Sequence, residues 1–93
     1  MIESKLYSRL TWKERRTLRN EYIKDQDGKC CHCGGLLSKS PPPEITNKKI
    51  NKKLFPVSFF SNPIHLHHSH DTDKTIGAVH AYCNAVLWQY YGE

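Results

Sequence analysis

The chain has no long hydrophobic run. No stretch within its 93 residues approaches the ~20 apolar residues of a transmembrane helix, and the opening residues Met1–Lys5 do not resemble a signal peptide. A membrane span is therefore not expected, nor is a secreted framework of two disulfides. The sequence predicts a cytoplasmic protein whose thiols are reduced and available to a metal ion.

Acidic residues are few, with 9 Asp and Glu against 14 Lys and Arg, which gives a net charge of +5. Basic residues are in turn nearly absent from the C-terminal part, because Lys74 is the one Lys or Arg after Lys53. This distribution favours a polyanionic partner. The N-terminal part would contact a phosphate backbone and the histidine-rich C-terminal part would carry the chemistry, although a mildly basic protein can also bind nothing.

The chain is too short to bury a large apolar core. Residues 1–93 are predicted to form a single domain that is stabilised by a structural metal ion. Two pairs of Cys and His, each with two residues between its members, have the spacing of a closed tetrahedral Zn²⁺ site. These four ligands are Cys30, Cys33, His80 and Cys83. Cys31 is left as a spare thiol, which can be buried as a small hydrophobic residue.

The N-terminal half contains the signals of a basic helix. Thr11 and Glu14 form a capping box, so a helix is expected over residues 12–26, with Gly28 as its left-handed cap. The basic residues on this helix either form a solvated face or lie along phosphates. Residues 28–35 then read as a zinc knuckle, in which a tight turn brings two thiolates to one ion.

The rest of the chain divides into an insertion and a compact C-terminal unit. Residues 38–63 begin with three prolines, which favour an extended conformation, and continue through lysines that either stay solvated or contact DNA. The apolar residues 54–60 are expected to pack on the domain. The C-terminal unit reads as a strand over 64–68, a polar loop over 69–77, a strand over 78–82 and a helix over 83–91.

The spacing of these motifs resembles that of the HNH (ββα-metal) endonucleases, and most closely the phage recombination endonuclease VII type. The motifs are Cys30-x-x-Cys33, then His67-His68-Ser69-His70, then His80-Ala81-Tyr82-Cys83-Asn84. The resemblance implies a small α+β fold with a ββα-metal (His-Me finger) core over 64–91, preceded by the basic helix and held by structural zinc. It also implies a phage protein that acts in the host cytoplasm.

The resemblance further implies an enzyme that hydrolyses phosphodiester bonds in DNA. By the match, His68 is the general base, His67 and Asn84 ligate a catalytic divalent ion such as Mg²⁺, Mn²⁺ or Ni²⁺, and His70 orients or contacts the phosphate. His67 stands where endonuclease VII relatives carry Asp, which shifts the metal preference toward borderline ions. His80 replaces the first Cys of the second zinc pair, an ordinary exchange in a zinc frame.

Regular strand geometry places a condition on this catalytic scheme. Successive residues of a strand face opposite sides, so the strand must end or twist if His67 and His68 are to serve one site.

Other functions remain open. The alternatives are a non-catalytic zinc-finger module that binds DNA and a zinc protein that binds another protein through its aromatic C-terminal helix. Asn84 could be only a helix N-cap, and His65, His67 and His70 could form an adventitious metal site. The sequence leaves open whether the protein is a monomer or a homodimer.

Overall fold

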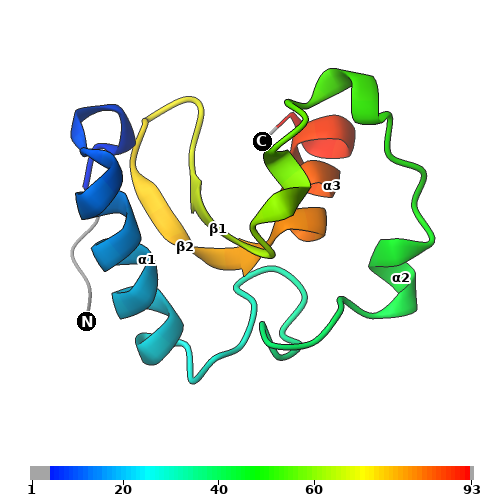
Figure 1. Ribbon diagram of the computed structural model, residues 1–93, viewed down its shortest axis with the longest axis horizontal. Coiled ribbons are helices and arrows are strands. Elements are labelled where there is room, and N and C mark those ends of the chain that lie inside the picture. Colours follow the sequence, from blue (N-terminus) through cyan, green and yellow to red (C-terminus); the bar gives the residue numbers. More distant parts are fainter. Residues whose placement is uncertain (1–4, 93) are drawn as a thin grey trace.

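The computed structural model describes residues 5–92, which form a small α+β fold (Figure 1). Its sheet has two antiparallel strands, and these lie between α1 on one side and α3 with residues 38–63 on the other. No helix within residues 5–92 is long and apolar enough to cross a membrane. In chain order the elements are the 3₁₀ helix η1 (Tyr7–Arg9), α1 (Trp12–Asp25), α2 (Pro43–Thr46), the 3₁₀ helices η2 (Lys52–Leu54) and η3 (Phe59–Ser61), the strands β1 (Ile64–His68) and β2 (Thr75–His80), and α3 (Ala81–Tyr91).

The capping box fixes the start of α1, as the sequence predicts. The amide of Glu14 donates to the Thr11 hydroxyl at 3.2 Å, and the amide of Thr11 donates to the Glu14 carboxylate at 3.0 Å. The helix ends at Asp25, one residue before the predicted end. Gly28 then takes the left-handed conformation, with φ 73°, and its amide donates to the Ile23 carbonyl at 2.8 Å. This turn leads the chain directly into the cysteine knuckle.

The second strand begins earlier than the sequence indicates. It spans Thr75–His80 instead of residues 78–82, so the preceding loop is shorter than the predicted 69–77. The difference arises because Gly77 and Thr75 pair with His67 and His68 of β1. The N-terminal segment also reaches this part of the chain, since the Thr75 amide donates to the Lys5 carbonyl at 2.8 Å and the Tyr7 amide donates to the Asp73 carbonyl at 2.7 Å. Pairing between residues so far apart in sequence leaves no local signal.

The C-terminal helix also begins earlier than predicted, at Ala81 instead of residue 83. The Ala81 amide donates to the Pro63 carbonyl at 2.8 Å, and His80 occupies the N-cap position without a side-chain capping bond. Asn84 therefore lies inside the helix, which rules out its role as the N-cap. At the other end Gly92 is the left-handed C-cap with φ 74°, so the helix ends at residue 91, as predicted.

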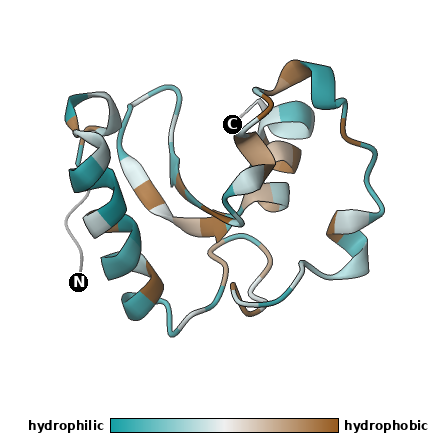
Figure 2. Ribbon diagram, viewed as in Figure 1, coloured by the Kyte–Doolittle hydropathy of each residue, from teal (hydrophilic) through white to brown (hydrophobic). Residues whose placement is uncertain are grey.

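The core lies where both helices meet the hairpin. Leu18 and Tyr22 of α1 pack toward the strands, and Val79 and Val86 are almost completely buried. Apolar residues are concentrated on the hairpin and α3, whereas α1 is mostly hydrophilic (Figure 2). The basic surface of α1 is thus solvated on most of its circumference.

Residues 38–63 are not a simple extended linker. Pro42 is extended, with φ −65° and ψ 162°, but Pro43 then begins α2, a position that tolerates proline. The Tyr82 hydroxyl donates to the Lys48 carbonyl at 2.8 Å, which holds this segment against α3. The expected packing of the apolar stretch is confirmed for its phenylalanines, since the Phe55 ring lies 5.5 Å from that of Trp88. Val57, in contrast, is fully exposed.

Gly77 allows α1 and the knuckle to approach β2 closely. The Gln26 side chain accepts from the Ala78 amide and donates to the Ala78 carbonyl, both at 2.9 Å. A Cβ at Gly77 would lie 2.7 Å from the Gln26 side-chain oxygen and 3.1 Å from the Cys31 sulfur. The glycine therefore matters for space, not for an unusual backbone conformation.

We expect Gly77→Ala to lower the free energy of unfolding by about 1–3 kcal/mol, the usual effect of overpacking a closely packed contact. Urea unfolding of zinc-loaded protein measures this change. Gly35→Ala is the matched control, because a Cβ there meets only the Cys33 sulfur at an ordinary 3.5 Å. Equal stability of the two variants would contradict the packing role of Gly77.

Candidate functional site

The four predicted zinc ligands meet in one cluster that can hold a metal ion such as zinc. The ligand atoms of Cys30, Cys33, His80 and Cys83 all lie within 4.8 Å of one another. The first pair comes from the knuckle after α1, His80 ends β2, and Cys83 lies in the first turn of α3. Three of the four residues are buried and Cys33 is partly buried. Such a closed Cys₃His set is typical of structural zinc sites.

The orientation of His80 fits metal binding. Its Nε2 lies 2.9 Å from the Leu36 carbonyl oxygen and 2.8 Å from that of Lys39. Because both partners are acceptors, Nε2 carries the proton and Nδ1 presents its lone pair. Nδ1 lies 3.4 Å from the Cys33 sulfur and 3.6 Å from the Cys83 sulfur. A histidine ligand held through its other nitrogen by backbone carbonyls is the usual arrangement around zinc.

The knuckle backbone favours thiolates. The amides of His32 and Cys33 donate to the Cys30 sulfur at 3.4 and 3.5 Å, and the Gly35 amide donates to the Cys33 sulfur at 3.4 Å. The hydrogen bond from the Cys83 thiol, helped by backbone amides, lowers the pKa of Cys30 to about 4. The same contact raises the pKa of Cys83. A bound cation would replace the proton that the two sulfurs share.

Cys31 does not belong to the cluster. Its side chain is exposed, which corrects the expectation that it is buried as a small hydrophobic residue. Its backbone amide donates to the Ala78 carbonyl at 2.9 Å. The residue thus serves the fold through its main chain, while its thiol stays outside the metal site.

Metal loading should depend on Cys83 and not on Cys31. Because metal binding contributes folding free energy, Cys83→Ser or removal of the ion by a chelator should unfold the domain. Protein purified without added zinc should contain about one Zn²⁺ per chain, measured by elemental analysis alongside circular dichroism. Cys31→Ser is the matched control and should keep both metal and fold. A folded, zinc-free Cys83→Ser protein would contradict this assignment.

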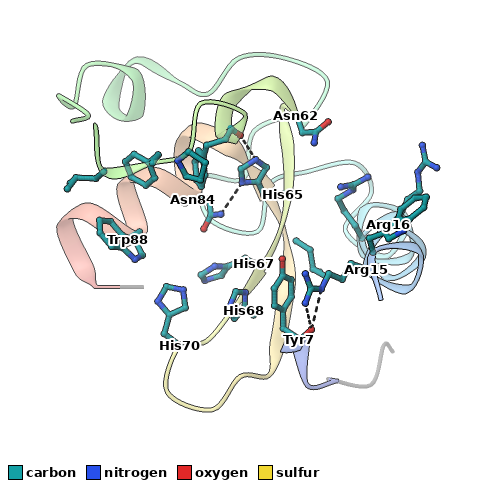
Figure 3. A pocket seen from close by; sticks show the side chains of 17 residues that line it. Tyr7, Arg15, Arg16, Asn62, His65, His67, His68, His70, Asn84 and Trp88 are labelled. Atoms are coloured by element: carbon teal, nitrogen blue, oxygen red, sulfur yellow. Dashed lines mark hydrogen bonds between the residues drawn. The ribbon is translucent and has the colours of Figure 1, made fainter. Parts of the chain in front are cut away.

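A second site lies in a cavity of about 720 Å³ between α1 and α3. Strand β1 supplies His65, His67 and His68 to its lining, and the loop after it supplies His70 (Figure 3). Asn84 of α3 lines the same cavity. The four histidines and the asparagine that the sequence singles out therefore come together. Three arginines of α1 line it too: Arg15, Arg16 and Arg19.

The hairpin is irregular where the neighbouring histidines line the cavity. His67 pairs with Gly77 and His68 pairs with Thr75, so Ile76 has no partner across the strand. Such a bulge bends the strand that carries the extra residue and increases the local twist. Both His67 and His68 line the cavity beside it. The irregularity coincides with the residues at which the sequence requires the strand to end or twist, although its place on β2 could not be foreseen.

Asn84 is oriented by a hydrogen-bond chain through His65. The Asn84 side-chain amide nitrogen donates to His65 Nδ1 at 3.1 Å, and His65 Nε2 donates to the Phe59 carbonyl at 2.8 Å. Burial lowers the pKa of His65, which favours this neutral form. The Asn84 oxygen then points away from His65 (Figure 3). Sequence reasoning treats His65 only as a possible adventitious ligand, and its one signal is its place two residues before His67 in the strand.

His68 is held by a stack that sequence reasoning misses. The Tyr7 ring lies parallel to the His68 ring, with centroids 3.9 Å apart and planes 5° apart. On Tyr7, the Arg15 guanidinium lies 4.0 Å from the ring centroid and donates to the Tyr7 carbonyl. Tyr7 itself is fixed because Ser8 hydrogen-bonds Asp73 through both its amide and its hydroxyl. No local pattern marks this contact, since Tyr7 and His68 lie far apart in the sequence.

The environment of His68 favours its neutral form. Partial burial lowers the pKa of His68, nearby His70 lowers it further, and Asp73 opposes these effects. The His70 ring centroid lies 5.1 Å from that of His68, at an interplanar angle of 62°. His70 itself is exposed at the edge of the cavity. A neutral imidazole can accept a proton.

Within residues 5–92, the Cys₃His set is the only group of three or more His, Cys, Asp or Glu that could hold a metal ion. An ion between His67 and Asn84 would have only these two protein ligands, so water or phosphate oxygens would complete its coordination. No protein-family model, curated protein or solved structure matches the chain. Function is therefore argued from the site itself.

Proposed function

We propose that the protein is a metal-dependent DNA endonuclease of the HNH (ββα-metal) type, with β1, β2 and α3 as its core. The observation that carries the proposal is the presence of His67, His68 and Asn84 in one cavity lined by arginines. The separate Cys₃His cluster supports it, because none of these three residues belongs to that cluster. Resemblance of the spacing to the endonuclease VII type points to the same activity.

Each residue has a role that its surroundings support. Neutral His68, held on the Tyr7 ring, would accept a proton from the water that attacks the phosphodiester. His67 and the Asn84 oxygen would hold one divalent ion, which when bound neutralises charge on the phosphate and the leaving oxygen. Exposed His70 would contact the phosphate. The arginines of α1 would bind neighbouring phosphates of the strand.

The catalytic ion should be separable from the structural one. His67→Ala and Asn84→Ala should abolish metal-dependent nicking of plasmid DNA while keeping the fold and the tightly bound Zn²⁺. Because an imidazole nitrogen is a borderline ligand, Mn²⁺, Co²⁺ or Ni²⁺ should support nicking at least as well as Mg²⁺ at equal concentration. His32→Ala is the matched control, since His32 is exposed and lies outside the cavity. Nicking that persists in both variants would place the metal elsewhere.

His68→Ala should remain folded, bind DNA normally and cut roughly 10²- to 10⁴-fold more slowly, the usual loss when a positioned base is removed. Because the pKa of His68 is lowered by burial and by His70, more than half of this base is neutral at pH 6.5, the ordinary pKa of histidine. The parent rate should therefore reach half of its plateau below pH 6.5 and fall at lower pH, and the variant should lose this dependence. Cleavage by His68→Ala at the parent rate would contradict the role of His68 as the general base. No cleavage by the parent itself would favour the alternative, a zinc module that binds DNA without cutting it.

A further inference from the structure

The two walls of the cavity differ in chemistry. One wall comes from α1 and is mainly basic, with Arg15, Arg16 and Arg19 beside the exposed indole of Trp12. The other is aromatic, with Trp88 of α3 beside Phe55 and Phe59. Figure 3 shows the histidines of β1 between Arg15 and Arg16 on one side and Trp88 on the other. A substrate that reaches His68 therefore passes between charged groups and flat apolar rings.

The aromatic wall is held by edge contacts. The Trp88 and Phe55 ring centroids lie 5.5 Å apart at an interplanar angle of 68°, and Phe55 lies 4.6 Å from Phe59. Phe59 in turn contacts His65 at 4.6 Å. Trp88 nevertheless remains 40% exposed while it lines the cavity. A fixed and partly uncovered indole is suited to stacking with another flat ring.

The bases of a double helix could not stack on this aromatic wall. In duplex DNA each base is covered on both faces by its neighbours, so a ring beside the duplex meets sugars and phosphates. Proteins that bind single strands instead combine a basic groove along the backbone with aromatic rings on which the bases stack. The cavity has both parts, and its volume of about 720 Å³ lies in the range that encloses a small ligand, which suits a nucleotide and not a duplex.

We propose that the cavity takes a single DNA strand, with an unstacked base on Trp88 and the adjoining phosphates along the arginines of α1. This inference rests on the proposed DNA hydrolysis, because it places the strand as the substrate of the histidine site. It adds that unpaired DNA is bound in preference to duplex DNA. The scissile phosphate then lies between the stacked base and the basic wall, next to His68.

Binding of fluorescein-labelled oligodeoxythymidine and of a duplex of equal length, without added divalent ion, tests this directly. Fluorescence anisotropy should show tighter binding of the single strand. Trp88→Ala should weaken single-strand binding roughly tenfold or more, the loss typical of a stacking aromatic, and leave duplex binding unchanged. Trp88→Phe should retain most of the affinity. Arg16→Gln should weaken both ligands alike, because phosphate contacts do not distinguish them.

Tyr91→Ala is the matched control, because Tyr91 is an exposed aromatic residue of the same helix outside the cavity. Fluorescence quenching of Trp88 is a second measurement, and it does not require the Trp88→Ala variant to fold. The chain has two tryptophans, so Trp12→Phe leaves Trp88 as the sole indole, and oligodeoxythymidine should quench its fluorescence. Absence of quenching, or an equal loss of affinity for both ligands in Trp88→Ala, would overturn the inference.

Failure of the single-strand inference can be distinguished from failure of the nuclease proposal. If the parent protein nicks plasmid DNA but Trp88 neither discriminates strands nor is quenched, the nuclease stands and the single-strand inference is wrong. If no divalent ion supports cleavage while Trp88-dependent binding of the single strand is observed, the nuclease proposal fails. The cavity is then a binding site for unpaired DNA.

Discussion

The Cys₃His cluster is the interaction on which the rest of the structure depends. It joins the knuckle that directly follows α1 to the end of β2 and the first turn of α3. Those two helices carry the opposite walls of the histidine cavity, so an ion in the cluster would fix the distance between the walls. A domain of this size buries little apolar surface, and metal binding would supply folding free energy that the core lacks. An ion in the cluster would therefore stabilise both the fold and the shape of the candidate active site.

The side chains of the cavity are positioned by irregular structure and by contacts between distant segments. The hairpin bulges at Ile76 of β2, beside the place where His67 and His68 line the cavity. The chain from the Phe59 carbonyl through His65 fixes the amide of Asn84, and the Tyr7 ring fixes the plane of His68. Each contact comes from a different part of the sequence. Side chains held in this way need little rearrangement when a substrate binds, which is the general requirement for efficient positioning.

Much of this architecture is readable from the sequence where the signals are local. The Thr11 capping box, the left-handed Gly28 and the two-residue spacing within the cysteine and histidine pairs all predict what is found. Signals fail where distant segments meet: the Thr75 amide at the start of β2 donates to the Lys5 carbonyl, and the Tyr7 ring stacks on His68. The burial of Cys31 is predicted wrongly, because its main-chain amide contacts the Ala78 carbonyl while its thiol stays exposed. The histidine and asparagine roles remain predictions, since the structure gives their positions and not their chemistry.

The central claim is that a second metal site lies in the cavity, apart from the cysteine cluster. Titration of Mn²⁺ into zinc-loaded protein, followed by nuclear magnetic resonance, tests it without any assay of activity, because the paramagnetic ion broadens signals of nearby nuclei. We expect the imidazole protons of His67 and the side-chain amide protons of Asn84 to broaden at lower Mn²⁺ concentrations than the signals of His32 and His80. Broadening confined to His80, or none at His67 and Asn84, would contradict it.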